Sequence, residues 1–279
     1  MQNVRTLLRP NTIDEAIEGV RDRPFSSYLA GGTFLALKQD PALQTLVDLS
    51  LLGLATAQPV PTGIRVGAMV ALETLRRDPL LIQLGAGVLA DALGRTRSTA
   101  WRNQATLGGR IRETEPTDLV TTALLLLDAV CVVHAAPCIP PTAVPLAQVA
   151  GLPAEALIVA VDISATLGWR CALEAFQETS LAPPLVAVGV ALRLDRHGAV
   201  QAARVATCGM TPHPARAAHL ELALVGATTP SVIDASPHAL DADILPVDDW
   251  RASAAYRTHL GSTLLGRALR RAVEVETPP

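Results

Sequence analysis

The chain has 279 residues, of which 49% are hydrophobic and 18% charged, and its formal net charge at pH 7 is −3. This length and apolar content suffice for two domains, or for one domain with substructure, and exclude a disordered chain. The slightly negative charge and the lack of a basic run argue against nucleic acid as a main partner.

The most apolar segments, residues 119–133 and 183–194, are short or interrupted by charged residues. Neither reaches the roughly 20 apolar residues of a membrane span, and the N-terminus lacks the apolar core of a signal peptide. We therefore expect a soluble, cytoplasmic protein without a membrane span. Four cysteines in so long a chain do not suggest a disulfide framework, and their spacing favours structural thiols over metal ligands. They are Cys131, Cys138, Cys171 and Cys208.

The first 52 residues are typical of a compact α/β unit. A cap at Asn11 or Thr12, followed by acidic residues, predicts a helix from about residue 13. Residues 27–30 and 45–49 predict two strands, the second of them buried. The first strand runs directly into a pair of glycines.

This first loop, residues 30–34, contains the glycine pair Gly31 and Gly32. Adjacent glycines permit a positive φ and bring backbone N–H groups close to another molecule without a β-carbon in the way. Thr33 adds a hydroxyl at the same place. A loop of this kind at the end of a strand is where ligands commonly bind in α/β folds.

A second glycine pair, Gly108 and Gly109, follows Thr106, and we call residues 106–109 the second loop. Either glycine pair alone is a weak signal, because such pairs are common in ordinary turns. Together, two loops that can present amides to an anion predict the two sides of a phosphate site.

The middle of the chain predicts further elements of both kinds. Residues 63–68 favour a strand, and residues 80–93 one helix with Leu81, Leu84, Val88 and Leu89 on a common face. We also expect a helix over residues 119–127, capped near Asp118, and strands over residues 129–134 and 156–163.

The last third, from about residue 166, has a different character. Residues 184–194 and 200–208 alternate as paired antiparallel strands, with residues 195–198 as the hairpin between them. Residues 214–224 predict a helix. Residues 252–273 predict a long terminal helix whose apolar stripe begins after Arg257.

Several motifs in order resemble one family across essentially the whole chain. Ala30-Gly-Gly-Thr33 is similar to the family's first flavin loop, and Val66-Gly-Ala-Met-Val-Ala-Leu-Glu-Thr-Leu75 to its next block. Arg102-Asn-Gln-Ala-Thr-Leu-Gly-Gly109 resembles the second flavin loop, and Arg251-Ala-Ser-Ala-Ala-Tyr256-Arg257 resembles part of the family's C-terminal module. The family is that of the flavin-binding medium subunits of molybdenum hydroxylases, which includes carbon monoxide dehydrogenase and the middle section of xanthine dehydrogenase.

The resemblance implies an α+β fold: a two-part FAD-binding fold of the vanillyl-alcohol oxidase type, followed by a C-terminal α/β module with an antiparallel sheet. Residues 1–52 and 53–165 would form the two FAD-binding subdomains, and residues 166–279 the C-terminal module. FAD would lie between the two halves, with its pyrophosphate on the backbone amides of the two loops. The cofactor-binding residues implied are Ala30, Gly31, Gly32, Thr33, Phe34, Thr106, Gly108, Gly109 and Asp118.

The resemblance also implies a function and partners. Such a subunit takes electrons from iron–sulfur clusters on a small subunit, which receives them from a large subunit that carries the molybdenum cofactor. Its FAD then reduces an external acceptor. Bond-making on the organic substrate belongs to the large subunit, so no catalytic residue and no metal ligand is expected in this chain.

The sequence departs from the family pattern around the expected flavin ring. Phe34 stands where the family usually has a polar residue, Arg110 where it favours asparagine, and the acidic run 113–115 replaces small apolar residues. These departures leave open an alternative function, a structural subunit of the same kind of assembly that has weakened or lost FAD binding. An independent flavin oxidase is a third option, for which no histidine or tyrosine is suitably placed.

Two residues have competing interpretations. Asp118 resembles an acid that touches the flavin cofactor in the family, but it also suits the N-cap of the helix that follows it. Trp101, beside the second loop, could stack on an aromatic ring, although a tryptophan of the core is the more favoured interpretation.

Overall fold

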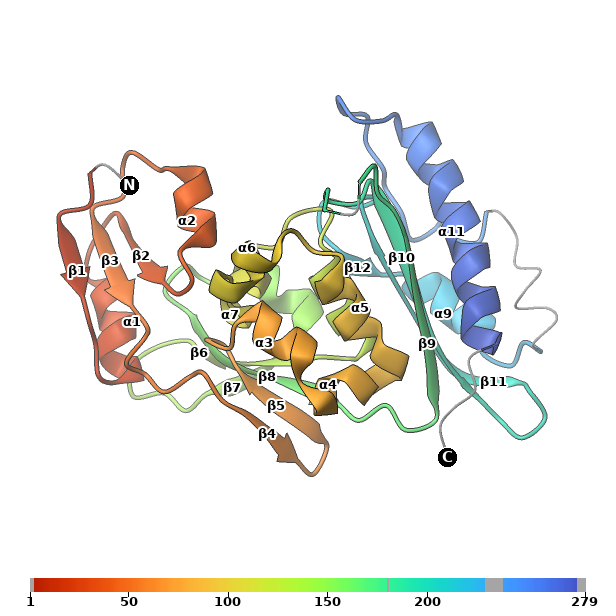
Figure 1. Ribbon diagram of the computed structural model, residues 1–279, viewed down its shortest axis with the longest axis horizontal. Coiled ribbons are helices and arrows are strands. Elements are labelled where there is room, and N and C mark those ends of the chain that lie inside the picture. The colour runs from red at the N-terminus through yellow and green to blue at the C-terminus, as the bar shows by residue number, and fades with distance from the viewer. Residues whose placement is uncertain (1–2, 180, 229–237, 275–279) are drawn as a thin grey trace. The chain divides into compact units, whose positions relative to one another are not determined.

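The structure, a computed structural model, describes residues 3–179, 181–228 and 238–274 (Figure 1). Its contacts divide the chain into two compact units, each interrupted in sequence. The first unit comprises Met1–Leu75, Ser98–Glu113 and Ala129–Ser164, and the second comprises Arg76–Arg97, Thr114–Asp128 and Ala165–Pro279. The division into three consecutive parts stays a prediction.

A three-stranded parallel sheet and one helix open the first unit. The sheet has the order β1 (Thr6–Leu8), β3 (Thr45–Asp48), β2 (Ser26–Leu29). Helix α1 (Ile13–Arg21) begins as predicted, because the side chain of Thr12 accepts a hydrogen bond from the Glu15 amide.

A five-stranded antiparallel sheet completes the first unit. Its order is β4 (Ala57–Val60), β5 (Gly63–Gly67), β8 (Leu157–Ser164), β6 (Val130–His134), β7 (Thr142–Pro145), and the 3₁₀ helix η2 (Leu146–Gly151) follows β7. Ile17 and Val47 of the small sheet region share one hydrophobic cluster with Leu157 and Val159 of β8. The two sheets of this unit are therefore joined by a common core.

Four six-residue helices connect the strands of the first unit, and the sequence pattern did not predict them. A helix of one and a half turns is too short to show a 3.6-residue period. The four are α2 (Thr33–Lys38), α3 (Leu72–Arg77), whose last two residues belong to the second unit, α6 (Thr99–Gln104) and α7 (Leu107–Arg112).

The second unit is built on a four-stranded antiparallel sheet of order β12 (Ala215–Arg216), β11 (Val200–Cys208), β10 (Val186–Leu194), β9 (Trp169–Phe176). The predicted pairing of β10 with β11 is confirmed. The helix predicted from residue 214 begins later, as α9 (Ala218–Leu224), because the residues before it pair with β11 as β12.

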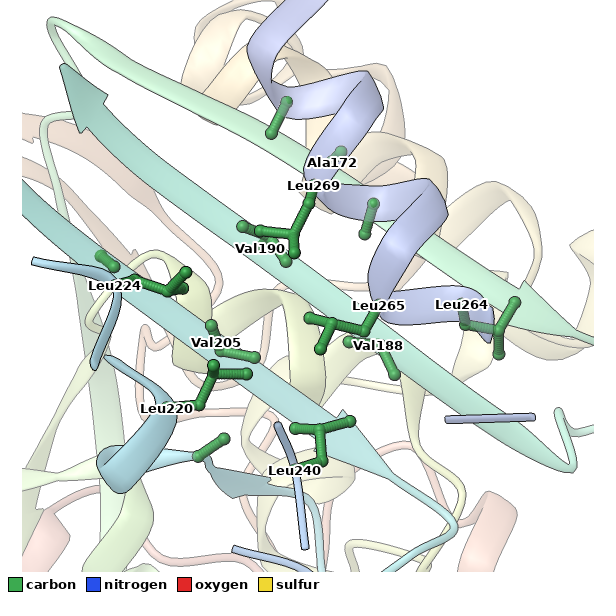
Figure 2. Packing of buried hydrophobic residues seen from close by; sticks show 14 of the residues in the cluster. Ala172, Val188, Val190, Val205, Leu220, Leu224, Leu240, Leu264, Leu265 and Leu269 are labelled. Atoms are coloured by element: carbon green, nitrogen blue, oxygen red, sulfur yellow. The ribbon is translucent and has the colours of Figure 1, made fainter. Parts of the chain in front are cut away.

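Helix α11 (Ala254–Glu274) covers this sheet, and Figure 2 shows its leucines directed at the valines of the strands. The predicted stripe is buried, and its members Leu264, Leu265, Ala268, Leu269 and Ala272 are at most 3% exposed. Burial begins earlier than predicted, at Arg257, which is 4% exposed. Its guanidinium donates to the carbonyl oxygens of Leu185 and Gly209, each at 2.9 Å, and to Asp249 at 2.6 Å.

The helix predicted over residues 80–93 was wrong as a single element. It is divided into α4 (Pro79–Gln83), the 3₁₀ turn η1 (Leu84–Gly87) and α5 (Val88–Gly94), because Gly85 and Ala86 have φ angles of 55° and 53°. The Gly85 amide donates to Thr166 Oγ1 at 2.7 Å, which holds the break in place.

Helix α8 (Leu119–Leu126), predicted over residues 119–127, is buried on every side. In the described part of the chain no helix is long and apolar enough to cross a membrane.

Candidate functional site

The first loop presents a run of unbonded backbone amides. Gly32 has left-handed angles, φ 68° and ψ −4°, and is the N-cap of α2, which no side chain caps. The N–H groups of residues 31–35 have no acceptor among the described residues. Successive N–H groups around a left-handed residue at a helix start form a concavity suited to an anion.

The two glycines of the first loop are required for different reasons. A β-carbon on Gly32 would have only Leu29 Cδ1 within 4 Å, at 3.4 Å, so space is open beside these amides. A β-carbon on Gly31 would instead overlap the carbonyl oxygen of Gln104. Gly32 therefore supplies the conformation and the open space, and Gly31 permits the close approach of two backbone segments.

Three of the four backbone amides of the second loop, those of residues 107–109, are used inside the protein. Leu107 donates to the carbonyl oxygen of Val70 at 3.0 Å, and Gly108 to that of Ala68 at 2.8 Å. The amide of Gly109 donates to Thr106 Oγ1 at 3.3 Å, so Thr106 caps α7. This loop offers an anion the hydroxyl of Thr106 rather than a row of open amides, which differs from the expectation of two equivalent loops.

The structure brings the two loops together within the first unit, as predicted. A β-carbon on Gly109 would lie 3.9 Å from the β-carbon of Ala30, and Gly31 meets the residue that ends α6. Loops separated by more than 70 positions in the sequence are therefore neighbours in space.

Charged and aromatic side chains come from the helices that follow the loops. Lys38 Nζ lies 5.8 Å from the centre of the Phe34 ring, at the other end of α2. Burial raises the pKa of the Glu113 carboxyl above its ordinary value, and the positive charges of Lys38 and Arg112 act in the opposite direction. The Arg112 guanidinium donates to the carbonyl oxygen of Pro153 at 2.7 Å.

Trp101 and Arg110 interact with one another. The Arg110 guanidinium carbon lies 5.9 Å from the centre of the Trp101 ring, and Arg110 is only 8% exposed. The partly buried Trp101 therefore has an interaction partner within the protein. This cation–π contact explains a tryptophan at this position without stacking on a ligand.

Asp118 and Glu115 belong to the second unit. Asp118 is 1% exposed; its carboxylate accepts from the Val120 amide at 3.0 Å and from Thr121 Oγ1 at 2.6 Å, so it caps α8 as predicted. Glu115 forms an ion pair with Arg97 at 3.0 Å. The flavin contact expected for Asp118 stays a prediction.

Sequence reasoning assigned no role to three residues that support the loops. Glu73 of α3 and Arg102 of α6 form a buried ion pair of 2.6 Å, and the carbonyl of Gln104 meets Gly31. All three lie within blocks that resemble family motifs. The local signal was a single carboxylate, Glu73, in mostly apolar sequence, and only the fold shows that it meets Arg102.

Two family models match the sequence. The model described as the FAD binding domain in molybdopterin dehydrogenase matches residues 2–163, more than half of the chain. The CO dehydrogenase flavoprotein C-terminal domain matches residues 172–272. A search of curated proteins found no match.

Solved structures with the same fold cover nearly all of the chain. Carbon monoxide dehydrogenase from Hydrogenophaga pseudoflava is 23% identical with a TM-score of 0.86, over 96% of this chain and 97% of that one. Reconstituted CO dehydrogenase from Oligotropha carboxidovorans is 22% identical with a TM-score of 0.87, over 97% of both chains. Quinoline 2-oxidoreductase from Pseudomonas putida 86 is 21% identical with a TM-score of 0.85, over 96% of both. At these identities the likeness shows the fold.

Proposed function

This chain belongs to the family of FAD-binding flavoprotein subunits of molybdenum hydroxylases, and we propose that it passes electrons from iron–sulfur clusters through FAD to an external acceptor. FAD is the cofactor of the domain family whose model matches residues 2–163. When bound, FAD supplies the redox chemistry by accepting electrons and delivering them to the acceptor.

The observation that carries the proposal is the row of open amides in the first loop. A pyrophosphate has two negative charges and needs converging N–H donors with no side chain between them. Residues 31–35 supply such donors, and the absent side chain of Gly32 leaves the space beside them free. The chain's own residues therefore fit the anionic part of FAD.

The surrounding residues bind and orient the cofactor in this proposal. Thr33 and Thr106 supply hydroxyl donors beside the pyrophosphate, Ala30 and Gly109 lie where the two loops meet, and Gly108 lets the second loop approach Ala68. Phe34 provides an apolar surface near the loop, with Lys38 beside its ring. Asp118 is proposed as a further contact in addition to its role as a helix cap.

A small iron–sulfur subunit and a large molybdenum-cofactor subunit are the proposed partners, and the cytoplasm is the proposed location. Family membership supports this, and one solved relative is described as lacking the Mo-pyranopterin moiety of the molybdenum cofactor. The partner subunits would hold the metal centres; within the described residues no group of three or more His, Cys, Asp or Glu side chains could hold a metal ion.

The flavin content of the purified protein tests the proposal. We expect a yellow protein with flavin absorbance, or a colourless one that binds one FAD per chain on reconstitution, in which dithionite bleaches the flavin band. A protein that stays colourless after incubation with excess FAD, while folded by circular dichroism, contradicts the proposal. That result would favour a structural subunit of the same kind of assembly.

A further inference from the structure

Two short helices beside the second loop are tied by an ion pair that is almost fully removed from water. Arg102 Nε of α6 donates to Glu73 Oε2 of α3 at 2.6 Å, and the two side chains are 6% and 4% exposed. Arg102 also donates to Thr99 Oγ1 at 3.0 Å. Removing one partner of such a pair leaves a buried charge uncompensated, so the pair strongly resists separation of α3 from α6.

The start of α3 holds α6 at a second point. The amide of Leu72, next to Glu73, donates to the carbonyl oxygen of Ala105 at 2.9 Å. Glu73 thus fixes the side chain of Arg102, and its neighbour Leu72 fixes the backbone of Ala105. Gln104 lies between these two anchors, so its carbonyl has little freedom to move.

Gln104 is the residue that meets the first loop. The β-carbon that Gly31 lacks would overlap the carbonyl oxygen of Gln104, so these two backbone segments are in close contact. Gly31 directly precedes Gly32, the left-handed N-cap residue of α2 around which the open amides lie. A shift of the Gln104 carbonyl would therefore shift the start of the first loop.

From these contacts we infer that the Glu73–Arg102 ion pair is a positioning device for the anion-binding amides of the first loop. It acts through Gln104 and Gly31, and neither charged residue itself contacts the cofactor. The inference rests on the proposed function, because those amides are the proposed contact with the FAD pyrophosphate.

The affinity for FAD separates this role from a merely structural one. Glu73→Ala should raise the FAD dissociation constant about tenfold, the equivalent of one charge-assisted hydrogen bond. Glu73→Gln, whose amide oxygen can accept the same Arg102 proton, should restore part of the affinity. Ile163→Ala is the matched control, because Ile163 is 1% exposed on β8 of the same unit and is paired with Ile64 of β5.

A positioning role requires the control to keep the wild-type dissociation constant while its melting temperature falls. Equal FAD affinities for wild type and Glu73→Ala overturn the inference, as does an equal loss of affinity in Ile163→Ala. If Glu73→Ala does not fold, Arg102→Lys replaces it, since lysine keeps the charge but loses the planar fork of donors.

A double-mutant cycle in flavin-free protein tests the mechanical link directly. Once the ion pair is lost, Gln104 can move away from an added methyl group on Gly31. Gly31→Ala should therefore raise the unfolding equilibrium constant by a factor at least threefold smaller in the Glu73→Ala protein than in the wild type. The same cycle between Gly31→Ala and Ile163→Ala should be additive. Additivity in the first cycle overturns the inference. If the wild type binds no FAD, the proposed function is contradicted. The double-mutant cycle still tests the link between the ion pair and the first loop, because it is measured without flavin.

Discussion

Gly31 and Gln104 touch through their backbones, so closely that a methyl group on Gly31 would overlap the carbonyl oxygen of Gln104. This contact joins a loop of the small parallel sheet to the end of α6 within the first unit. It explains one of the two adjacent glycines without any ligand, and it makes the first loop sensitive to residues more than 40 positions away.

We predict that Gly31→Ala lowers the free energy of unfolding by about 1–3 kcal/mol, because the obstructing atoms are backbone atoms that cannot turn aside. Urea denaturation measures the change. Gly151→Ala is the control: a β-carbon there would have nothing within 4 Å, so its effect should stay within about 0.5 kcal/mol. Equal stabilities of the two variants would contradict the contact.

The buried stripe of α11 makes a second prediction. Leu264 is 3% exposed in the cluster of the four-stranded sheet, so Leu264→Ala should cost about 2–5 kcal/mol of stability. Arg270 lies on the exposed side of the same helix, and Arg270→Ala should change little. Thermal unfolding compares the two variants. A melting temperature unchanged by Leu264→Ala would mean that the stripe is not buried against the sheet.

Elements with a long or distinctive local pattern could be predicted from the sequence. The Thr12 cap marks the start of α1, two alternating runs joined by a hairpin signal at residues 195–198 mark β10 and β11, and five apolar residues at helical spacing mark α11. In each case the local pattern agrees with the tertiary contacts.

The remaining features depend on residues far apart in the chain. Gly85 and Gly87 weaken a helix locally, but the break is held by Thr166, 81 positions away, so only the fold shows where the chain turns. The glycine pairs predicted two loops, but only the fold shows that the amides of Leu107 and Gly108 are bonded to the segment before α3. The glycine pattern could therefore indicate where the candidate site lies, but it could not show which loop has backbone N–H groups free of an acceptor.

Glu113 gives a prediction about pH. Because burial raises its pKa above the ordinary 4.5, the folded state binds more protons than the unfolded state between those two pKa values. Stability should therefore fall as the pH rises through that window and remain lower above it. Glu113→Gln should remove this loss, so the variant gains melting temperature over wild type as the pH rises from about 4 to 8.

Glu115→Gln is the contrasting variant for that experiment. It removes half of the ion pair with Arg97 and should not stabilise the protein at any pH. Identical pH profiles for wild type and Glu113→Gln would show that burial of Glu113 does not disfavour its charge.

The same residue bears on the proposed flavin chemistry. We propose, from the family resemblance, that the acidic run 113–115 lies near the flavin ring of bound FAD. A nearby carboxylate disfavours added negative charge by roughly 1 kcal/mol when partly screened. Glu113→Gln should therefore raise the reduction potential of bound FAD, measured by spectroelectrochemistry at about pH 8, where the carboxylate is ionised. Glu115→Gln should have a smaller effect, because Arg97 already balances that charge. An unshifted potential in Glu113→Gln would place its side chain away from the ring.

Titration of FAD into wild type, Gly32→Ala and Gly53→Ala tests whether the open amides of the first loop bind FAD. Gly32 and Gly53 have φ angles of 68° and 67°. A β-carbon on Gly32 would have only Leu29 Cδ1 within 4 Å, and one on Gly53 would have no atom within that distance. Alanine should therefore strain the two backbones alike, by about 1–2 kcal/mol. We predict that Gly53→Ala keeps the wild-type dissociation constant, whereas Gly32→Ala raises it at least about tenfold, because its methyl group enters the anion's space. Equal dissociation constants for the two variants would contradict binding of FAD by these amides.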